Sequence, residues 1–365
     1  MKHTLLILLL LCFFMCTAKA SSFDGQSHWY GTRWDRSIST IEGSEYSWTY
    51  DDNYIYIMRT TPNLICSSST LYRYSVIDHT IEKLNSYRFK YLARMELVNN
   101  RLFVEEWGVS FPDSREFKHL FAIDILKHSG YSLEKVYYEN QRIDMEFYKL
   151  GDDLVFYPFF YPNNAPRGSK AFVTSDGVTF YPSYTFLGAK VAISGLCMEA
   201  DEEYIFYQPS MHEFCLHVPK SAFGFTPQAF LIYEEKLYSL EFPYSDNTGV
   251  YVFNLSSNSE ELGLDLLFET KSLKGTDIDI PLSAINLWFS DGRLYYINGT
   301  ELESRSIDSI SEGEVTVYKL DIIRSLETSG GAFIIHDMLY SIERDADQLK
   351  EIALATGETT VYNLR

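Results

Sequence analysis

The sequence predicts an all-β fold built from one short unit that recurs along the chain. Three observations support this. A polar turn followed by an aromatic and aliphatic strand recurs at a regular spacing, alternating apolar residues follow several of these turns, and helical periodicity is almost absent. Residues 262–270 could form a short helix, but Leu262, Leu264 and Leu266 alternate in a way that fits a strand at least as well.

The recurring unit is found seven times. Each copy has two or three polar or acidic residues, then about four residues rich in Tyr, Phe, Leu and Ile, which suit a pleated sheet. The copies are YDDNYIYI, VNNRLFVE, LGDDLVFY, ADEEYIFY, YEEKLYSL, SDGRLYYI and IHDMLYSI. The strand residues that align are Tyr54, Leu102, Leu154, Tyr204, Leu237, Leu294 and Leu339.

The spacing of these residues is that of β-propeller blades. A period of about 40 to 50 residues, all strand and turn, is typical of such blades. We therefore expect one propeller of seven blades over residues 21–365, with six or eight blades as alternatives. An interval of 33 residues before Leu237 and one of 57 after it suggest that Leu237 lies on a second strand, whereas the other copies lie on a first.

Two segments carry a resemblance to known propellers. The turn SDGRLYY and the hairpin LKEIALATGETTVYNL resemble the blades of secreted β-propellers of the TolB, pyrroloquinoline-quinone and low-density-lipoprotein-receptor types. The resemblance spans residues 50–365 and implies four-stranded sheets stacked into a ring. The repeated Gly-His and Trp-Asp dipeptides of WD blades and the double glycines of kelch blades are missing from the sequence.

Closure of such a ring needs a seam between the two ends of the chain. One blade cannot cover both faces of its own sheet, so it is stable only against neighbours. We expect residues 25–50 to complete the blade that holds the C-terminal strand, with Trp29, Trp34 and Trp48 along the seam.

The N-terminal segment MKHTLLILLLLCFFMCTAKA predicts a secretory signal over residues 1–20. Its apolar run is shorter than the roughly 20 residues of a membrane span, and no later run approaches that length. The expected location is therefore extracellular or periplasmic, without a membrane span.

The net charge of −19 disfavours a nucleic-acid partner. Nucleic-acid affinity comes largely from basic residues that neutralise phosphates, and removal of Lys2 and Lys19 with the signal would make the remainder more acidic. We expect a monomer whose partner is an extracellular protein or glycan.

Three cysteines follow the predicted signal, too few for a fold that depends on disulfides. In an oxidising compartment Cys197 and Cys215 could form one disulfide, which leaves Cys66 as a buried thiol. Two sequons, at Asn254 and Asn298, would be glycosylated if the source is eukaryotic.

The most unusual segment is FYPFFYPNNAPRGSKAF. Prolines at 158, 162 and 166 exclude a regular central strand, so it is predicted to be a long loop. Its exposed aromatic rings could form a ligand-binding surface, or they could fold back to cap a neighbouring blade. The candidate binding residues are Phe159, Phe160, Tyr161, Asn163, Asn164 and Arg167.

A second turn, VTSDGVTFY, is similar to the Asp-box hairpin of sialidases, with one residue fewer between Asp176 and Gly177. That element is structural, so we expect a hairpin turn.

His212 and His217, if both lie on one strand, would point to opposite faces and provide no metal site. Asp277 and Asp279 could contribute to a Ca²⁺ site only if a loop added oxygen ligands, and no other cofactor is expected.

No catalytic motif is present among G-x-S-x-G, H-E-x-x-H, Gly-rich phosphate loops and C-x-x-C. Acidic pairs such as Glu105-Glu106 face opposite ways on a strand, so adjacency alone does not create the paired carboxylates of a glycosidase. The expected function is a non-catalytic binding module that uses the loops of one propeller face. The alternative is a secreted glycoside hydrolase or lyase with carboxylates in the central funnel.

Overall fold

The chain folds into antiparallel sheets, each made of four strands that follow one another in the sequence. In this computed structural model the described residues are 45–61, 67–89, 91–110, 115–126, 134–135, 137–138, 141–142, 145–150, 153–158, 170–185, 192–194, 197–199, 203–208, 211–225, 227–233, 236–241, 243–246, 248–254, 265–276, 287–310, 313–318, 329–343 and 346–364.

The described residues form seven such sheets, which we number 1 to 7 along the chain. Sheet 1 contains β1 (Glu45–Tyr50), β2 (Tyr54–Thr61), β3 (Ser67–Ser75) and β4 (Thr80–Phe89). Sheet 2 contains β5 (Tyr91–Val98), β6 (Arg101–Ser110), β7 (Arg115–Asp124) and β8 (Glu134–Lys135). Sheet 3 contains β11 (Met145–Leu150), β12 (Asp153–Pro158), β13 (Lys170–Thr174) and β14 (Tyr181–Thr185). Two short strands, β9 (Tyr137–Tyr138) and β10 (Gln141–Arg142), pair with each other between sheets 2 and 3.

The remaining sheets repeat the same order. Sheet 4 contains β15 (Ala192–Ser194), β16 (Cys197–Glu199), β17 (Glu203–Gln208) and β18 (Glu213–Pro219). Sheet 5 contains β19 (Pro227–Tyr233), β20 (Lys236–Glu241), β21 (Thr248–Asn254) and β22 (Asp265–Thr270). Sheet 6 contains β23 (Leu287–Ser290), β24 (Arg293–Asn298), β25 (Glu301–Ser306) and β26 (Thr316–Tyr318). Sheet 7 contains β27 (Ser329–Ile335), β28 (Met338–Glu343), β29 (Gln348–Ala353) and β30 (Thr359–Asn363).

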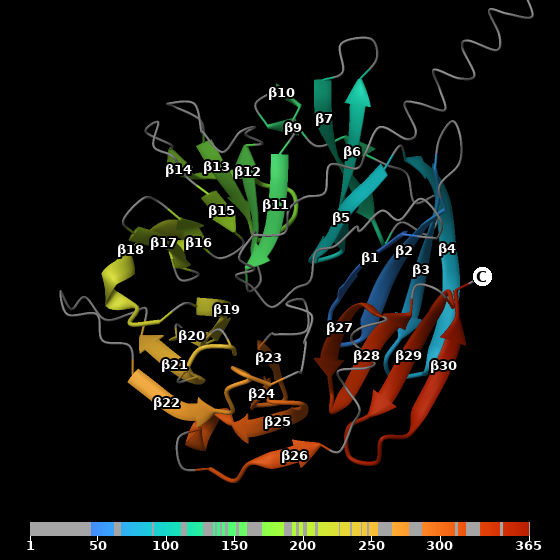
Figure 1. The fold of residues 1–365 in the computed structure, drawn as a ribbon. Coiled ribbons are helices and arrows are strands. Elements are labelled where there is room, and N and C mark those ends of the chain that lie inside the picture. The colour runs from blue at the N-terminus through green and yellow to red at the C-terminus, as the bar shows by residue number, and fades with distance from the viewer. Residues whose placement is uncertain are drawn as a thin grey trace, which may run out of the picture.

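The sheets follow one another around a central axis, so that sheets 1 and 7 lie side by side (Figure 1). First strands of several neighbouring sheets are in contact, including β1 with β5 and β23 with β27. The all-β prediction is confirmed: the described helical segments are two short 3-10 turns, η2 (Lys220–Ala222) and η4 (Ile307–Ser309). Part of the segment that could have been a helix forms β22. Among the described residues, no helix has the length and apolar character needed to cross a membrane.

Six of the seven repeated units lie at the same place in their sheets. Each of these six is the turn between the first and second strands, followed by the second strand itself. Leu237 lies on a second strand, β20, but the other five aligned residues of this set do so too, and the prediction that they lie on first strands is wrong. The seventh unit differs, because Tyr204 lies on β17, the third strand of sheet 4. The short interval from Tyr204 to Leu237 therefore runs from a third strand to a second strand, and the long interval after Leu237 reflects the longer connections in and after sheet 5.

Left-handed backbone closes the tightest of these turns. Asp291 and Gly292 have φ of 48° and 72°, and His336 and Asp337 have φ of 48° and 56°. Each pair is a two-residue loop, because Ser290 pairs with Arg293 and Ile335 with Met338. Two successive positive φ values match the twist of the flanking strands. The acidic residues that the sequence pattern places here can adopt this conformation.

Aromatic side chains fill the space between neighbouring sheets. The largest described core cluster joins sheets 5, 6 and 7 to sheet 1. In it the Trp48 ring of β1 stacks on the Phe333 ring of β27, with the ring centres 4.3 Å apart. Trp48 therefore lies in the seam between the first and last sheets, as the sequence suggested. Trp29 and Trp34 lie outside the described residues.

The predicted exchange of strands at this seam is wrong for the described part of residues 25–50. Strand β1 pairs with β2 and belongs to sheet 1, whereas sheet 7 already has four consecutive strands and ends with β30. Side chains connect the two sheets instead. The Arg59 guanidinium donates to both oxygens of Asp347, from Nε at 3.1 Å and from Nη2 at 2.7 Å, and the Tyr46 hydroxyl donates to the same carboxylate.

Candidate functional site

The aromatic loop predicted as a binding surface falls outside the described residues. It connects β12 to β13, so it leaves sheet 3 at the end opposite the turn between β11 and β12. Phe159, Phe160, Tyr161, Asn163, Asn164 and Arg167 therefore stay a prediction. Asp277 and Asp279 also lie outside the described residues.

The other end of the sheets contains more of the described turns, and we call it the turn face. It carries the turn between the first and second strands of each sheet and the turn between the third and fourth. Backbone hydrogen bonds join these two turns in four sheets. They run from Val76 N to Asn53 O (2.9 Å), Ile125 N to Asn100 O (3.0 Å), Ile307 N to Gly292 O (2.9 Å) and Leu354 N to Asp337 O (3.1 Å).

Four apolar side chains project from the turn face. They occupy the turns between third and fourth strands in sheets 1, 2, 3 and 4, and 58–68% of each is exposed. We call Ile77, Leu126, Val178 and Met211 the apolar row. Single exposed apolar residues are ordinary, but one at the equivalent turn of four successive sheets is a repeated feature of one face.

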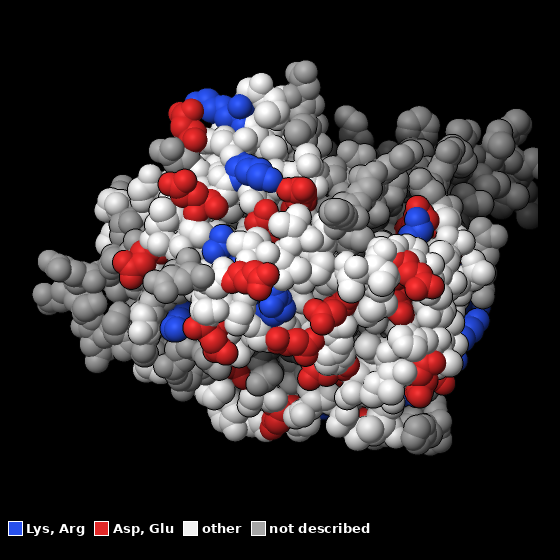
Figure 2. All heavy atoms as spheres, turned by 90° about the horizontal axis from the view of Figure 1, so that it is seen from below, with Lys and Arg blue, Asp and Glu red and all other residues white. Residues whose placement is uncertain are grey.

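The charged residues of the turn face are acidic. Its exposed carboxylates include Asp52, Asp78, Asp176, Asp291, Asp308, Asp337 and Glu358. Among the described residues of these turns there is no Lys or Arg. Figure 2 is turned by 90° from Figure 1 and shows the side of the sheet array, not the turn face; there too Asp and Glu are widely spread, and Lys and Arg form no broad patch.

The Asp-box-like turn lies on this face between β13 and β14. The Asp176 carboxylate accepts hydrogen bonds from the backbone N–H groups of Val178 and Thr179, both at 2.7 Å, and from the Thr179 and Thr174 hydroxyls. Burial alone would raise the pKa of Asp176, but these hydrogen bonds outweigh it and lower the pKa to about 2. The predicted hairpin is confirmed, and its role is to fix the loop.

Gly177 in this turn approaches the neighbouring sheet closely. Its φ is +74°, and a Cβ added there would lie 3.3 Å from both the Arg101 Cβ and the Val98 carbonyl oxygen. The turn of sheet 3 is thereby packed against the β5–β6 hairpin of sheet 2, and the Asn99 amide donates to the Asp176 carbonyl at 3.4 Å.

At each of two seams between neighbouring sheets, one buried carboxylate contacts both a tyrosine and a histidine. Asp153 of sheet 3 accepts from the Tyr207 hydroxyl of sheet 4 at 2.6 Å and lies 2.7 Å from Nδ1 of His212. Glu351 of sheet 7 receives the Tyr74 hydroxyl of sheet 1, and His79 Nδ1 lies 3.1 Å from its other oxygen. Burial first, and the adjacent carboxylate second, raise the pKa of Tyr207 and of Tyr74 well above the usual range.

Sequence reasoning missed these Tyr–carboxylate–His clusters, although a signal was present. In both, the histidine follows its tyrosine by five residues and has a positive φ in a turn between third and fourth strands. The sequence argument placed His212 on one strand with His217. His212 instead lies in the turn that precedes this strand. Among the described residues there is no group of three or more side chains placed to hold a metal ion.

Two smaller predictions do not fit the described contacts. The first is the disulfide between Cys197 and Cys215, whose thiol lies 3.8 Å from the Met211 sulfur. Strand β17 lies between β16, which carries Cys197, and β18, which carries Cys215. Strands are spaced about 4.8 Å apart, so the two Cα atoms are separated by two such spacings, beyond the roughly 4.4–6.8 Å that a disulfide spans. Cys66 lies outside the described residues.

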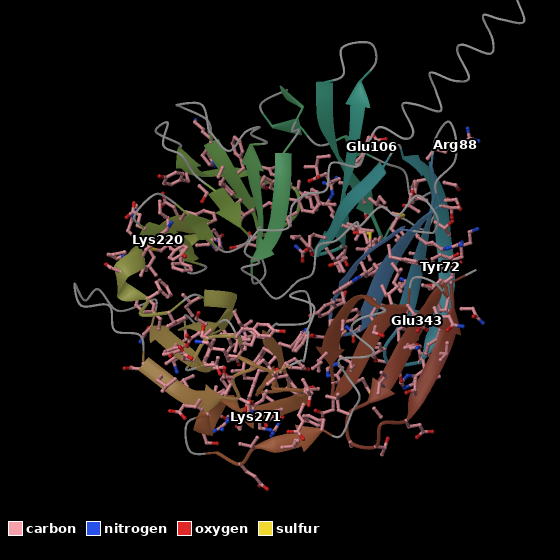
Figure 3. The ribbon with its side chains drawn as sticks, viewed as in Figure 1. Tyr72, Arg88, Glu106, Lys220, Lys271 and Glu343 are labelled. Atoms are coloured by element: carbon pink, nitrogen blue, oxygen red, sulfur yellow. The ribbon has the colours of Figure 1, made fainter. Side chains whose placement is uncertain are left out.

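The second is the predicted glycosylation of Asn298. Only 8% of it is exposed, its Nδ2 donates to Glu303 at 2.8 Å, and its Oδ1 accepts the Lys271 backbone N–H at 2.6 Å. A glycan on Nδ2 would disrupt this packing of sheet 6 against the end of β22, near the labelled Lys271 in Figure 3. Asn254 is exposed at the end of β21 and remains a predicted site.

Comparison with known proteins adds information on the fold alone. No protein-family model matches the chain, and no curated protein matches its sequence. Similar solved structures include an uncharacterised protein of Listeria monocytogenes, with 8% identity and a TM-score of 0.51 over 91% of this chain and 98% of that one.

Propellers are among the other similar structures. The β-propeller domain of the Trilobed protease of Pyrococcus furiosus is 8% identical, with a TM-score of 0.47 over 88% of this chain and 98% of that one. A chain of a nidogen/laminin complex is 10% identical, with a TM-score of 0.37 over 80% of this chain and 90% of that one. At these scores neither supports a conclusion about function.

Proposed function

We propose that this chain is a secreted, non-catalytic binding module, a single seven-bladed β-propeller whose partner contacts the turn face. The seven four-stranded sheets would be the blades, and the ring would close where sheet 1 packs on sheet 7. Both the blade count and the closure are consistent with the order of the sheets in Figure 1.

The apolar row is the observation that carries this proposal. Four aliphatic or thioether side chains are held in solvent at equivalent turns, where each adds exposed apolar surface to the same face. Burial of that surface by a partner would be favourable, at roughly 25 cal/mol per Å². Backbone hydrogen bonds fix the turns that present Ile77 and Leu126, and the Asp176 carboxylate fixes the turn that presents Val178, so these side chains need little ordering on binding.

The chemistry of this face favours a protein over a glycan. Ile, Leu, Val and Met offer no flat ring on which a sugar could stack. The buried core of a protein interface, in contrast, is apolar and enriched in Met. A glycan would suit the predicted aromatic loop, which belongs to the opposite end of sheet 3. The two surfaces can therefore be tested separately.

The test is a binding screen of the secreted chain against extracellular-protein and glycan arrays. For each hit, the affinity is then measured with a variant of the apolar row, I77S/L126S/V178S/M211S. We expect at least a tenfold loss for a protein hit. The matched control is V317S/V361S, which changes apolar residues of 45–46% exposure on the outer strands β26 and β30. Equal effects of both variants, or no effect of the first, would reject the turn face.

A parallel variant, F159A/F160A/Y161A, tests the aromatic loop. Loss of a glycan hit in this variant alone would assign glycan binding to the loop. Chemical change of a bound glycan, detected by mass spectrometry, would instead support the glycoside hydrolase or lyase alternative. In the described seams, Asp153 and Glu351 each hold a tyrosine hydroxyl, which is a structural use of a buried carboxylate.

A further inference from the structure

His336 lies where three sheets meet on the turn face. It is the first residue of the two-residue turn between β27 and β28, with φ of 48°. Its backbone N–H donates to Ser290 Oγ in sheet 6 at 3.1 Å. Its ring extends between the turns of the two neighbouring sheets. Nδ1 lies 3.3 Å from both carboxylate oxygens of Asp291 in sheet 6, and Nε2 lies 3.1 Å from the backbone carbonyl oxygen of Asp52 in sheet 1.

Both groups that the ring faces are hydrogen-bond acceptors. A neutral imidazole carries one N–H and can donate to only one of them, whereas an imidazolium carries two N–H groups and can donate to both. The geometry therefore selects the protonated ring for the complete set of contacts. Gain or loss of the second ring proton would therefore change the number of contacts that the ring makes.

We propose that His336 is a proton-operated clasp between sheets 6, 7 and 1. When protonated it holds sheet 7 to both neighbours, and when neutral it releases one of them. The contact with Asp52 crosses the seam between the first and last sheets, so its loss would loosen the place where the two ends of the sheet array meet.

The charges around the ring support a cation at this position. The ionisable side chains in the three turns are all carboxylates: Asp51, Asp52, Asp291 and Asp337. Two of these already have donors: Asp51 accepts the backbone N–H groups of Asn53 and Tyr54, and Asp337 accepts the Tyr295 hydroxyl at 2.6 Å. Arg293, the first residue of β24, donates instead to Ser304 and Thr316.

The histidines of the Tyr–carboxylate–His clusters differ from His336 in the bond they need. His79 and His212 contact their carboxylates through Nδ1, and a neutral ring with its proton on Nδ1 can make that bond. The contacts of His336 to two acceptors on two different sheets are therefore what makes it sensitive to the second proton.

Hydrogen–deuterium exchange of the intact protein tests the clasp at about pH 5.5 and about pH 8. After correction for the intrinsic pH dependence of exchange, we expect the β1–β2 and β27–β28 hairpins to exchange at least threefold faster at the higher pH. Asparagine adopts positive φ readily, so H336N keeps the turn, and this variant should lose the difference in exchange rate between the two pH values. The control H217N removes a histidine whose partner, Glu203, lies within the same sheet, and should keep it.

An equal pH difference in the wild type and in H336N would overturn the proposal. If H336N does not fold, D291N replaces it, and nitrogen-15 NMR of the unaltered protein supplies an independent test. We expect both ring nitrogens of His336 to carry protons at the lower pH. A ring that carries one proton there would refute the clasp.

Discussion

Asp347 and Arg59 are 288 residues apart in the sequence and form a bidentate ion pair across the seam between sheets 7 and 1. Both side chains are largely shielded from solvent, with 22% of Arg59 and 14% of Asp347 exposed. Two parallel N–H···O bonds to one carboxylate give this pair a fixed geometry. Asp347 has φ of 54° in the turn between β28 and β29, a conformation that Asp and Asn adopt more readily than most residues.

The first prediction concerns this ion pair. D347N keeps the turn conformation but removes the charge, and we expect a loss of about 1–2 kcal/mol of unfolding free energy. The control is E343Q, which breaks the similarly exposed pair of Glu343 with Lys350 at 2.8 Å within sheet 7 and should cost less than about 0.5 kcal/mol. Urea denaturation measures both. Equal losses of unfolding free energy would show that the Asp347–Arg59 pair contributes no more to stability than an ion pair within one sheet.

The second prediction concerns the aromatic contact at the same seam. W48A should cost about 3–5 kcal/mol, because a large buried ring stacked on Phe333 is removed and a cavity remains. W48F retains a ring and should cost clearly less. Denaturation curves followed by circular dichroism give both values. If W48A were as stable as the wild type, the contact between sheets 1 and 7 would not support the fold.

The third prediction is an acid dependence from the Asp176 turn. The hydrogen bonds to the Asp176 carboxylate outweigh its burial and lower its pKa to about 2, below the value of about 3.9 for an unfolded chain. A lowered pKa stabilises the folded state above the unfolded value, and that contribution is lost as the pH falls from about 4 toward 2. D176N should therefore be less stable than the wild type at neutral pH, with the difference shrinking in acid. A difference that is constant over this range would contradict the assignment.

The fourth prediction is cooperative unfolding in alkali. Burial, with a smaller effect of Asp51, raises the pKa of Tyr56 to about 12, and burial with adjacent carboxylates raises the pKa of Tyr74, Tyr207 and Tyr295 further. A raised pKa stabilises the folded state below the unfolded value of about 10, and this contribution is lost as the pH rises through the folded value. Phenolate absorbance should therefore appear together with the loss of circular dichroism. Ionisation of these residues without unfolding would show that they are accessible.

The strand pattern could be predicted from the sequence because it depends on local chemistry. The turn and strand units begin the second strand of six sheets and the third strand of sheet 4, and the hairpin around Gly357 forms β29 and β30. The assignment of these units to first strands failed because a repeat fixes a period but not which strand comes first in the sheet.

The candidate site was less predictable. To predict the apolar row, one must know which side chains the turns expose. In the sequence, residues such as Ile77 and Val178 resemble ordinary strand residues. Asn298 is the opposite case, a residue that the sequence suggested would be exposed and that the structure buries. Its sequon gives no indication of the contacts with Glu303 and the Lys271 backbone.

The sequence by itself determined the all-β character, the repeat and the positions of the tight turns. These follow from side-chain alternation and from residues that tolerate positive φ, both of which act over a few neighbours. Only the tertiary structure decided how sheet 1 meets sheet 7 and which carboxylates receive Tyr46, Tyr74 and Tyr207. Those contacts join residues 54 to 301 positions apart, and their geometry exists only after the sheets have packed around the axis.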